Sequence, residues 1–575
     1  MTDFNLTPEQ QSIVGHDGSA FISACPGAGK TRCITERARK VLSDSSNGKG
    51  IAFLSFTNAA ISELEERLQG EGLLPTPVFP YFVGTFDSFI WKYLVEPYGI
   101  DVSDERVSLI PDKGELTVKP FSSGQDIKLS CFNRDTGSLI PSEAPSLRNP
   151  NTHAAYEAAA RNARNRLLEH GYVDFHDVRE IAAKNLSSPT FNGRLAQILR
   201  ARFREIIIDE AQDCNPHDLS IVEWLRSTAN ISTKVVCDPH QSIYGFRGGV
   251  SEELFQYEEG FPSEQRLSLS GNFRSSGQIC KVIHSLRAPE YRALSSPDAA
   301  LGPHSDSEIH IHVISYQGAV SNVIGSSFIA LLRRYGLKSY QCRLVAKTRT
   351  SALNAVGAYT GSIGQSLSQQ LASAVMKFHY DDGSKAKLEA IQETHRLLLH
   401  VGGHLEGKTY HQYLSDEGLE AVSWRGHVLK ILRSLKFDAS RGDSRVEWLG
   451  RVHQEVGPFI QNSGKTVAQL FRNEAKVDCI LEVTPVSELI PATVHEVKGQ
   501  EFEGMCVVLT TATANGILNY LSGNSHGGMA EEARVFYVAA SRAEKLLVVA
   551  CPRSQSSRLV DHISQYGAHV TESEI

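Results

Sequence analysis

With 575 residues, the chain is too long for a single core, and its length predicts roughly four domains. Hydrophobic residues make up 41% of the chain and charged residues 21%, which excludes a largely disordered chain and an integral membrane protein. The net charge of -7 gives no global indication of a nucleic-acid partner and mildly disfavours a polyanion.

The first four residues have neither the basic nor the apolar region of a secretory signal, and no apolar run is long enough to span a membrane. We therefore expect a cytoplasmic protein without membrane contact. Ten cysteines are scattered along the chain without a C-x-x-C pair. That pattern is typical of reduced, mostly buried thiols and not of a disulfide framework, a zinc site or an iron–sulfur site.

The first strong signal is a phosphate-binding pattern. An apolar run at 21–24 leads into a Gly/Pro loop and then into a helix-compatible stretch at 32–42. In such a strand–loop–helix, backbone N–H groups and the helix N-terminus surround phosphate groups. We expect Lys30 at the β- and γ-phosphates of ATP and Thr31 at Mg²⁺. Ala24 departs from the strict glycine pattern, and a plain glycine-rich turn is the alternative. The residues assigned to the nucleotide here are Ala24, Cys25, Pro26, Gly27, Ala28, Gly29, Lys30, Thr31 and Arg32.

A second apolar run, at 204–208, ends in the adjacent acids Asp209 and Glu210. The run has the form of a buried parallel strand, and ligands of open α/β sheets sit at the carboxyl ends of strands. Asp209 would then hold Mg²⁺, while Glu210 polarises the attacking water. A solvent-facing acidic pair that caps a helix is the alternative, and the phosphate loop upstream favours the catalytic interpretation.

Apolar runs alternate with helical patterns, which predicts an α/β fold with parallel sheets and helices on both faces. Expected strands lie at 51–56, 79–83 and 233–237, with helices at 59–68 and 86–93. After about residue 267 the pattern restarts, with strands at 308–315, 342–347, 505–510 and 545–551 and a helix at 320–335. Two α/β domains are therefore predicted.

Each α/β domain is interrupted. The first is expected at 1–93 and 151–271, with an insert at 94–150 that can extend to about 173; its Pro-, Gly- and Ser-rich stretch precedes an Ala- and Arg-rich helix. The second is expected at 272–350 and 486–575. Its insert at 351–485 is predicted to be mainly helical, because apolar residues recur at helical spacing in 390–401 and 446–456.

Several motifs occur in one order that resembles the UvrD/Rep-like branch of superfamily 1 helicases (superfamily 1A). The resemblance is densest at 6–90, 174–285 and 490–551. It implies two RecA-like P-loop NTPase motor domains, each with an inserted subdomain. It also implies that ATP binds between the motors, so that hydrolysis becomes a hinge motion.

The N-terminal motifs suggest contacts to adenine and to DNA. Residues 6–10 resemble the Q motif, in which Gln10 would read the adenine edge. Residues 55–60 are similar to motif Ia, which implies that Phe56 stacks on a base while Thr57 and Asn58 contact phosphate. Residues 85–89 resemble the next DNA-contacting motif and begin with Thr85. Ala59 and Asp87 stand where the family usually has Lys and His, which removes positive charge.

Residues 237–248 resemble motif III. The resemblance implies that Gln241 senses the γ-phosphate and that Tyr244, Phe246 and Arg247 hold single-stranded DNA. Aromatic faces suit this role, because stacking contributes roughly 1–3 kcal/mol per base without sequence preference.

The remaining motifs lie in the second half. Residues 269–275 resemble motif IV, which implies Phe273 on the adenine and Arg274 on the γ-phosphate. Residues 493–503 are similar to motif V, with His495 on the DNA backbone, Gly499 near the nucleotide and Glu501 on the ribose. Residues 535–543 resemble motif VI, in which Arg542 is the candidate arginine finger. One such guanidinium can change the rate by about 10³–10⁵.

The leading hypothesis is an ATP- and Mg²⁺-dependent helicase or translocase that moves 3′-to-5′ on single-stranded DNA and acts on 3′-tailed duplexes. A DNA-sensing ATPase subunit that signals to a partner without processive unwinding is the alternative, favoured by Ala59, Asp87 and the modest second insert. A P-loop small-molecule kinase is a third interpretation, and it leaves the motif III aromatics and Arg542 without a role.

In size and architecture the chain also resembles the UvrD-like subunit of the Gabija antiviral system, which works beside an ATP-gated nuclease of the OLD/TOPRIM type. That narrower resemblance implies a nuclease partner and a role in antiviral defence. DNA repair is the other pathway that the family resemblance suggests.

Overall fold

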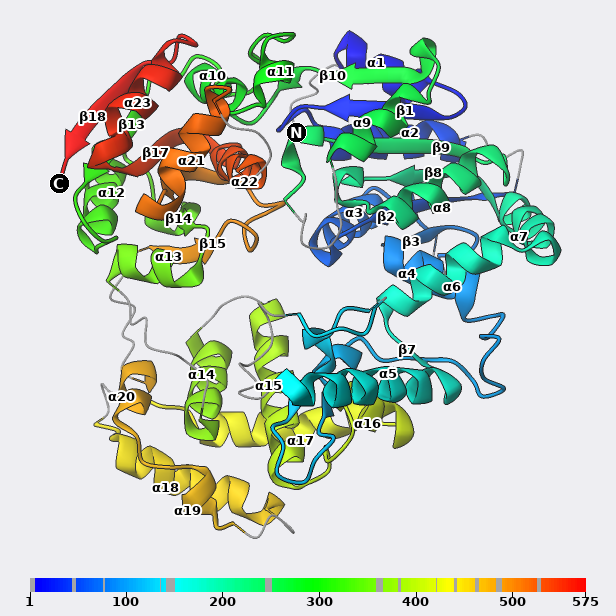
Figure 1. Cartoon of the computed structure of the whole chain (residues 1–575). Helices are drawn as coiled ribbons and strands as arrows, with labels where there is room; N and C mark the ends of the chain where they lie inside the picture. Colours follow the sequence, from blue (N-terminus) through cyan, green and yellow to red (C-terminus); the bar gives the residue numbers. More distant parts are fainter. Residues whose placement is uncertain are drawn as a thin grey trace. The chain divides into compact units, whose positions relative to one another are not determined.

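The computed structural model (Figure 1) describes residues 6–43, 48–75, 78–134, 136–140, 150–243, 251–357, 366–380, 384–419, 421–438, 442–460, 465–481, 489–524 and 529–575. These residues divide into two compact units, each built from separate stretches of the chain. Unit 1 draws on residues 1–94, 182–358 and 487–575, and unit 2 draws on 95–181 and 359–486.

The first sheet of unit 1 has six parallel strands in the order β10-β1-β9-β8-β2-β3. Because all strands run the same way, their carboxyl ends meet at one edge, where Ser55 pairs with Thr85 and Ala24 with Leu269. The strands are β1 (Ala20–Ala24), β2 (Gly50–Ser55), β3 (Phe82–Thr85), β8 (Phe203–Ile208), β9 (Ser232–Cys237) and β10 (Arg266–Leu269).

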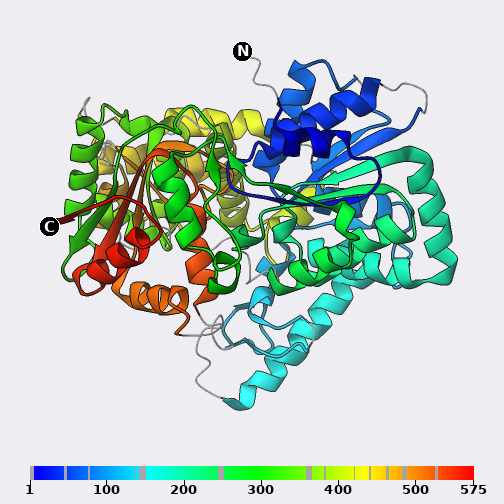
Figure 2. The same ribbon diagram turned by 90° about the horizontal axis from the view of Figure 1, so that it is seen from above.

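Helices cover both faces of this sheet (Figures 1 and 2). On one face Ile22, Phe53 and Val236 form a core with helix α2. On the other face the ring of Phe21 packs against Tyr257 and Phe261, in and just after α9. The helices of this part are α1 (Pro8–Gly15), α2 (Lys30–Ser43), α3 (Asn58–Gly70), α4 (Phe86–Ile90), α7 (Pro189–Arg202), α8 (Pro216–Ser227) and α9 (Ser251–Glu259), and α6 (Phe175–Ser187) begins in unit 2 and ends in unit 1.

The second sheet of unit 1 also has six parallel strands, in the order β15-β14-β16-β17-β13-β18. Along β17, Leu547 and Val549 belong to one core cluster and Leu546 and Val548 to another, as side chains alternate between the two faces. The strands are β13 (Ile311–Tyr316), β14 (Cys342–Ala346), β15 (Ile490–Thr493), β16 (Phe502–Val508), β17 (Ala543–Pro552) and β18 (Val570–Glu574).

Helices again lie on both sides of the second sheet, so its two core clusters are each covered. The main ones are α10 (Gly277–Ser285), α12 (Val323–Arg334), α13 (Arg349–Val356), α21 (Thr511–Leu521), α22 (Ala530–Ala540) and α23 (Arg553–Ser564). The predicted fold class, α/β with parallel sheets flanked by helices, is therefore confirmed.

Unit 2 holds the material predicted as inserts. Residues 95–181 contribute the short strand pairs β4 (Ser108–Leu109) with β7 (Tyr172–Val173) and β5 (Thr117–Val118) with β6 (Ile127–Lys128), and helix α5 (His153–Glu169). The rest of the unit consists of helices and loops, with no strand among its described residues. Its helices pack around Trp448 and are α14 (Leu367–Tyr380), α15 (Ser384–Val401), α16 (Tyr410–Asp416), α17 (Ala421–Ser434), α18 (Arg445–Val456), α19 (Val467–Leu470) and α20 (Ala475–Leu481).

The two parts of unit 2 bond to each other directly. The backbone N–H of His411 donates to Oδ2 of Asp112 at 3.2 Å, and the hydroxyl of Tyr172 donates to Asp416. Because unit 1 holds both sheets and unit 2 both inserts, the division into four domains with the boundaries given above stays a prediction.

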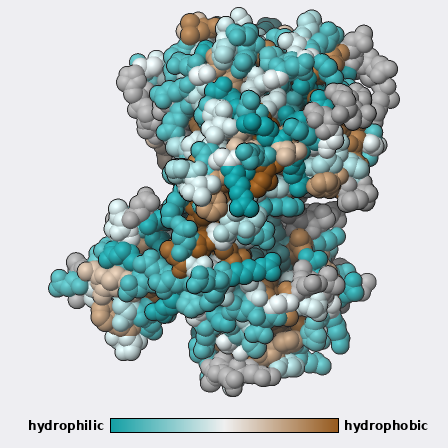
Figure 3. Space-filling model, turned by 90° about the vertical axis from the view of Figure 1, so that its right-hand side faces the viewer, coloured by the Kyte–Doolittle hydropathy of each residue, from teal (hydrophilic) through white to brown (hydrophobic). Residues whose placement is uncertain are grey.

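The face drawn in Figure 3 is mostly hydrophilic. Among the described residues, no helix combines the length and the apolar composition that crossing a membrane would require.

Candidate functional site

The phosphate-binding pattern forms the expected strand–loop–helix, with β1 ending at Ala24 and α2 beginning at Lys30. Gly27 and Gly29 have φ angles of 69° and 75°, in the left-handed region that favours glycine. A Cβ on Gly27 would also lie 2.7 Å from Cβ of Arg274. The loop needs glycine there both for its backbone conformation and because Arg274 lies so close.

A pocket of about 500 Å³ opens beside this loop, and we call it the phosphate-loop pocket. It combines residues from the carboxyl-terminal edge of the first sheet with residues from the second half of unit 1. Most predicted nucleotide residues line it: Pro26, Gly27, Ala28, Gly29, Lys30, Thr31, Arg32, Asp209, Glu210, Gln241, Phe273, Arg274, Gly499, Glu501 and Arg542. Four residues of α3 that the sequence did not suggest also line it, namely Ala60, Glu63, Leu64 and Arg67.

The acidic pair lies at the end of β8, next to the phosphate loop. Nζ of Lys30 is 3.2 Å from Oε1 of Glu210. Burial and the charge of Glu210 raise the pKa of Asp209 to about 7. Burial opposes ionisation of Glu210 as well, but the charges of Lys30, Lys498 and Arg542 outweigh it and lower its pKa to about 2. Glu210 is thus ionised at neutral pH.

The site also has the oxygen donors that Mg²⁺ prefers. Thr31 and Asp209 both line the phosphate-loop pocket, one with a hydroxyl and the other with a carboxylate. The raised pKa of Asp209 shows that its negative charge is poorly compensated by the protein. A divalent cation would supply that compensation, so the residues fit the ion.

Two arginines from the second half reach this pocket. Nη1 of Arg274 donates to the carbonyl of Ser541 at 2.8 Å, and its Nη2 donates to Glu501. Arg542 is 4% exposed and donates to Oε1 of Gln241. Burial and the neighbouring charge of Arg274 lower the pKa of Arg542 to about 10, so the guanidinium is still charged at pH 7.

A buried ion pair joins the two halves of unit 1 beside the pocket. Nζ of Lys498 donates to both carboxylate oxygens of Asp213, at 2.6 and 2.7 Å, and both side chains are less than 5% exposed. Lys498 also donates to the carbonyl of Gln241 at 3.3 Å, and Nε of Arg534 donates to the carbonyl of Ser242 at 2.7 Å. Sequence reasoning assigned no role to these charged residues.

The predicted DNA contacts of the first half lie at the carboxyl ends of β2 and β3. The ring of Phe56 stacks on Phe86, with centroids 5.2 Å apart. The hydroxyls of Thr57 and Thr85 accept the N–H groups of Ala60 and Ser88 and so cap α3 and α4.

The other predicted DNA contacts are less uniformly described. Asn58 is exposed at the start of α3, and Nε2 of His495 lies 3.3 Å from the carbonyl of Ile243. Tyr244, Phe246 and Arg247 lie outside the described residues. The DNA roles therefore stay predictions.

Gln10 lies behind the phosphate loop. It is 1% exposed, its Oε1 accepts from the N–H of Thr7 at 3.1 Å, and its Nε2 donates to the carbonyl of Ala28 at 3.2 Å. Its amide thus supports the loop in this structure. Gln10, Ala24 and Cys25 do not line the phosphate-loop pocket, and their contact with the nucleotide stays a prediction.

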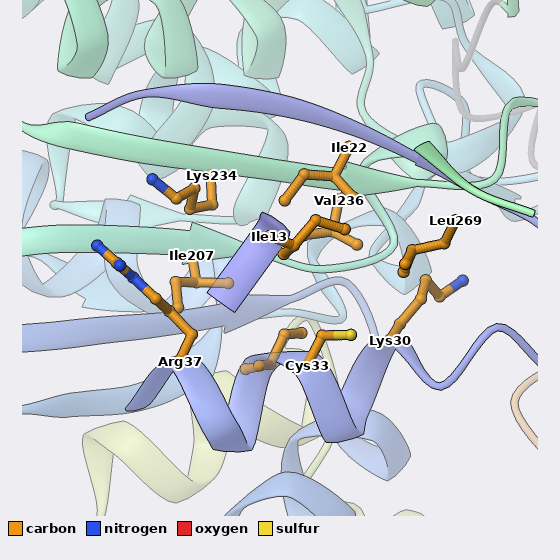
Figure 4. Close-up of a pocket in the computed structure, with 10 residues that line it drawn as sticks. Ile13, Ile22, Lys30, Cys33, Arg37, Ile207, Lys234, Val236 and Leu269 are labelled. Atoms are coloured by element: carbon orange, nitrogen blue, oxygen red, sulfur yellow. The ribbon is translucent and has the colours of Figure 1, made fainter. Parts of the chain in front are cut away.

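A second, much smaller cavity of about 20 Å³ lies beneath α2 (Figure 4). Its wall is mainly apolar and consists of Ile13, Ile22, Cys33, Ile34, Ile207, Val236 and Leu269. Lys30 lies at one end, and Arg37 and Lys234 lie at the other. The cavity has room for about one water molecule and therefore cannot hold a nucleotide.

Two family models match this chain. The family model described as "UvrD/REP helicase N-terminal domain" matches residues 6–262, and that described as "UvrD-like helicase C-terminal domain" matches residues 473–554. Together they match more than half of the chain.

Curated relatives include "ATP-dependent DNA helicase Rep" of Escherichia coli, 28% identical over 49% of this chain and 43% of the relative. "ATP-dependent DNA helicase UvrD1" of Mycobacterium tuberculosis is 27% identical over 49% of this chain and 39% of the relative. "Probable DNA helicase II homolog" of Mycoplasma capricolum is 21% identical over 97% of this chain and 86% of the relative.

The chain thus spans about two fifths of the length of Rep and UvrD1. The N-terminal and C-terminal domain models of one family match in chain order. The phosphate loop and the two parallel sheets fit that family. The chain belongs to the UvrD/Rep-like helicase family, and its sheets are those of RecA-like P-loop domains.

Proposed function

We propose that the chain hydrolyses ATP in the phosphate-loop pocket and uses that reaction to move 3′-to-5′ along single-stranded DNA and to separate 3′-tailed duplexes. One observation carries the proposal. Lys30 and Glu210 from the first half and Arg274 and Arg542 from the second half line one pocket. A nucleotide bound there contacts both halves, so loss of its γ-phosphate removes contacts that hold the two halves together.

The roles follow from charge and position. Glu210 is ionised and accepts a proton from the attacking water, while Lys30 and Arg274 neutralise phosphate oxygens. Arg542 stabilises the charge that develops during phosphoryl transfer, as the arginine finger. Thr31 and Asp209 would hold Mg²⁺, which when bound neutralises phosphate oxygens. Phe273 also lines the pocket, and we assign it to the adenine.

DNA binding is assigned to Phe56, Thr57, Asn58 and Thr85 at the ends of β2 and β3, together with Tyr244, Phe246, Arg247 and His495. The relatives Rep and UvrD1 are named as ATP-dependent DNA helicases, which supports DNA as the polymer. The stacked Phe56 ring offers a face of the kind that holds a base.

Two measurements test the proposal. ATP turnover is measured with and without single-stranded DNA, and strand displacement is compared on 3′-tailed and 5′-tailed duplexes. We expect DNA to stimulate turnover and displacement to need a 3′ tail and ATP. Turnover that is indifferent to single-stranded DNA would contradict the proposal and favour a small-molecule kinase.

The second candidate is a DNA-sensing ATPase subunit that activates a partner nuclease. It is favoured by Asp87, which stands where the family usually has a basic residue, and by the compact second insert. DNA-stimulated turnover without strand displacement on either duplex would select this candidate.

A place in a Gabija-type antiviral system, with a nuclease of the OLD/TOPRIM type as partner, is the narrowest form of the proposal. It rests on size and architecture alone, and DNA repair is the competing pathway. Co-purification with the product of a neighbouring nuclease gene tests it, and a neighbourhood of repair genes would contradict it. A cytoplasmic location is part of the same proposal.

A further inference from the structure

Asp238, at the end of β9, is a buried carboxylate whose polar atoms all have partners. It is 1% exposed. Its Oδ1 accepts from the backbone N–H of His240 at 3.0 Å. Its Oδ2 accepts from Nε2 of Gln241 at 2.8 Å and from the hydroxyl of Tyr537 at 3.3 Å. Its own N–H donates to Oε1 of Gln212 at 3.1 Å, so the carboxylate is fixed from several sides.

This arrangement decides which way the amide of Gln241 points. A carboxylate only accepts hydrogen bonds, so Gln241 must turn its NH₂ group towards Asp238. Its Oε1 then faces the other way and accepts from Nη2 of Arg542. A flipped amide would place two acceptors together at Asp238 and two donors together at Arg542. Asp238 therefore selects the Gln241 oxygen as the atom that faces the arginine finger.

Tyr537 reaches Asp238 from the second half of unit 1. It lies in α22 and is 1% exposed, while Arg542 follows directly after the same helix. One segment of the second half thus contacts two hydrogen-bonded residues of the first half. Tyr537 donates to Asp238, and Arg542 donates to Gln241. Neither Asp238 nor Tyr537 lines the phosphate-loop pocket, and their hydrogen bonds reach it through Gln241.

We propose that Tyr537 is a positioning residue for ATP hydrolysis, which holds Asp238 so that the carbonyl oxygen of Gln241 faces Arg542 and the γ-phosphate position. The role rests on the proposed function. Because the bond joins the two halves, Tyr537 adds its support to Asp238 only when α22 lies against the end of β9. Hydrolysis is therefore tied to that contact as well as to binding of the nucleotide.

Tyr537→Phe removes the hydroxyl and keeps the ring. We expect kcat for ATP to fall about 5- to 10-fold, as loss of one hydrogen bond of ordinary net strength implies, while KM changes less than about 2-fold because no pocket residue is lost. Tyr316→Phe is the matched control. It removes the hydroxyl of a similarly buried tyrosine in β13 of the second sheet, which donates to the carbonyl of Leu509. Tyr316 does not line the pocket, so the variant should leave kcat unchanged.

A double-mutant cycle separates positioning from general destabilisation. In a Gln241→Ala background, Tyr537→Phe should cause no further loss of residual turnover, because the amide that it orients is gone. Asp238→Asn, which can donate to the amide oxygen and favour the flipped amide, should lower kcat about as much as Gln241→Ala. Because Tyr537 is intact in Asp238→Asn, this variant still tests the orientation of the Gln241 amide if Tyr537→Phe does not fold.

Unchanged kcat in Tyr537→Phe, or equal losses with and without Gln241, would overturn the positioning role and leave the proposed function standing. A wild-type chain without any ATP turnover would overturn the proposed function and this role with it.

Discussion

At the scale of single residues, the charges of the phosphate-loop pocket are close enough to depend on one another. Lys30 lies 3.2 Å from Glu210, and burial opposes its protonation. The charges of Glu210, Asp209 and Asp238 outweigh that effect and raise the pKa of Lys30 above its ordinary value. Removing any one of these charges therefore changes the pKa values of the other groups, in addition to abolishing the role of the residue itself.

We predict that Lys30→Ala, Glu210→Gln and Arg542→Ala each abolish ATP turnover. For Arg542 the expected loss is about 10³-fold or more, because the guanidinium acts on charge that develops in the transition state. Lys281→Ala is a control, since this half-buried lysine bonds to the carbonyl of Gly567 and does not line the pocket. Normal steady-state turnover in any of the three variants would remove that residue from the catalytic set.

Lys234 gives a second prediction at this scale. Burial lowers its pKa to about 8, against the opposing charges of Glu205 and Asp17, and Arg37 adds to the effect. Because the unfolded chain binds the proton more tightly, the free energy of unfolding should rise between pH 8 and the ordinary lysine pKa of 10.5. Below pH 8 the buried ammonium destabilises the folded state.

Lys234→Met should therefore stabilise the protein at pH 7 by ~1–3 kcal/mol. The gain should shrink as the pH approaches 10.5. Urea denaturation at several pH values measures both effects, and equal pH dependence in variant and wild type would count against the assignment.

At the scale of elements, the sequence indicated the buried strands well and the edge strands poorly. Strands β2, β9, β14 and β17 are long apolar runs, and they lie within a few residues of the predicted ranges. Strand β15 contains Pro491, which disfavours a strand except at a sheet edge, and it is an edge strand. Strand β18 is a mostly exposed edge strand of polar residues, so no apolar pattern marks it.

The site prediction is also limited to residues that a local sequence pattern marks. Motif order predicted roles for Lys30, Glu210, Gln241 and Arg542, which line one pocket, because these residues stand in short local patterns. Glu63 and Arg67 of α3 line the pocket only because β2 and β8 are neighbours. Lys498 meets Asp213 across two distant segments, and local sequence contains no sign of such a contact.

The cavity beneath α2 gives a prediction for an element. Its apolar wall and small size leave part of the α2–sheet contact unfilled. Val236→Ile adds one methyl group from β9 and should stabilise the fold by about 0.5–1 kcal/mol. Ile207→Val should destabilise it by about 0.5–1.5 kcal/mol, because it enlarges the same cavity. Thermal denaturation measures both, and a lower Tm for Val236→Ile would show that the cavity cannot accept the methyl group.

At the scale of the whole molecule, the two halves of unit 1 are joined by charged groups that are almost inaccessible to water. The pair Lys498–Asp213 is the clearest case. Burial raises the pKa of Asp213 to about 6 even though Lys498 opposes the change. Such a pair is costly to break, because the group left behind has no access to solvent.

Lys498→Met should destabilise unit 1 by about 3–5 kcal/mol, as removal of one partner of a buried pair does. Lys347→Met is the matched control. Its partner Glu532 belongs to a more exposed pair, for which the expected effect is about 0–1 kcal/mol. Urea denaturation measures both, and similar losses in the two variants would contradict the special status of the buried pair.

The cysteines of the chain have a practical consequence. Nine of the ten are free and buried in the described structure, among them Cys25 in the phosphate loop and Cys237 beside Asp238. Burial raises the pKa of both thiols, so neither forms the reactive thiolate in the folded state. Labelling by a thiol-specific reagent therefore follows transient opening of the core. The rate of labelling at Cys25 and Cys237 reports how often the nucleotide-binding edge of the first sheet opens, and no probe has to be introduced.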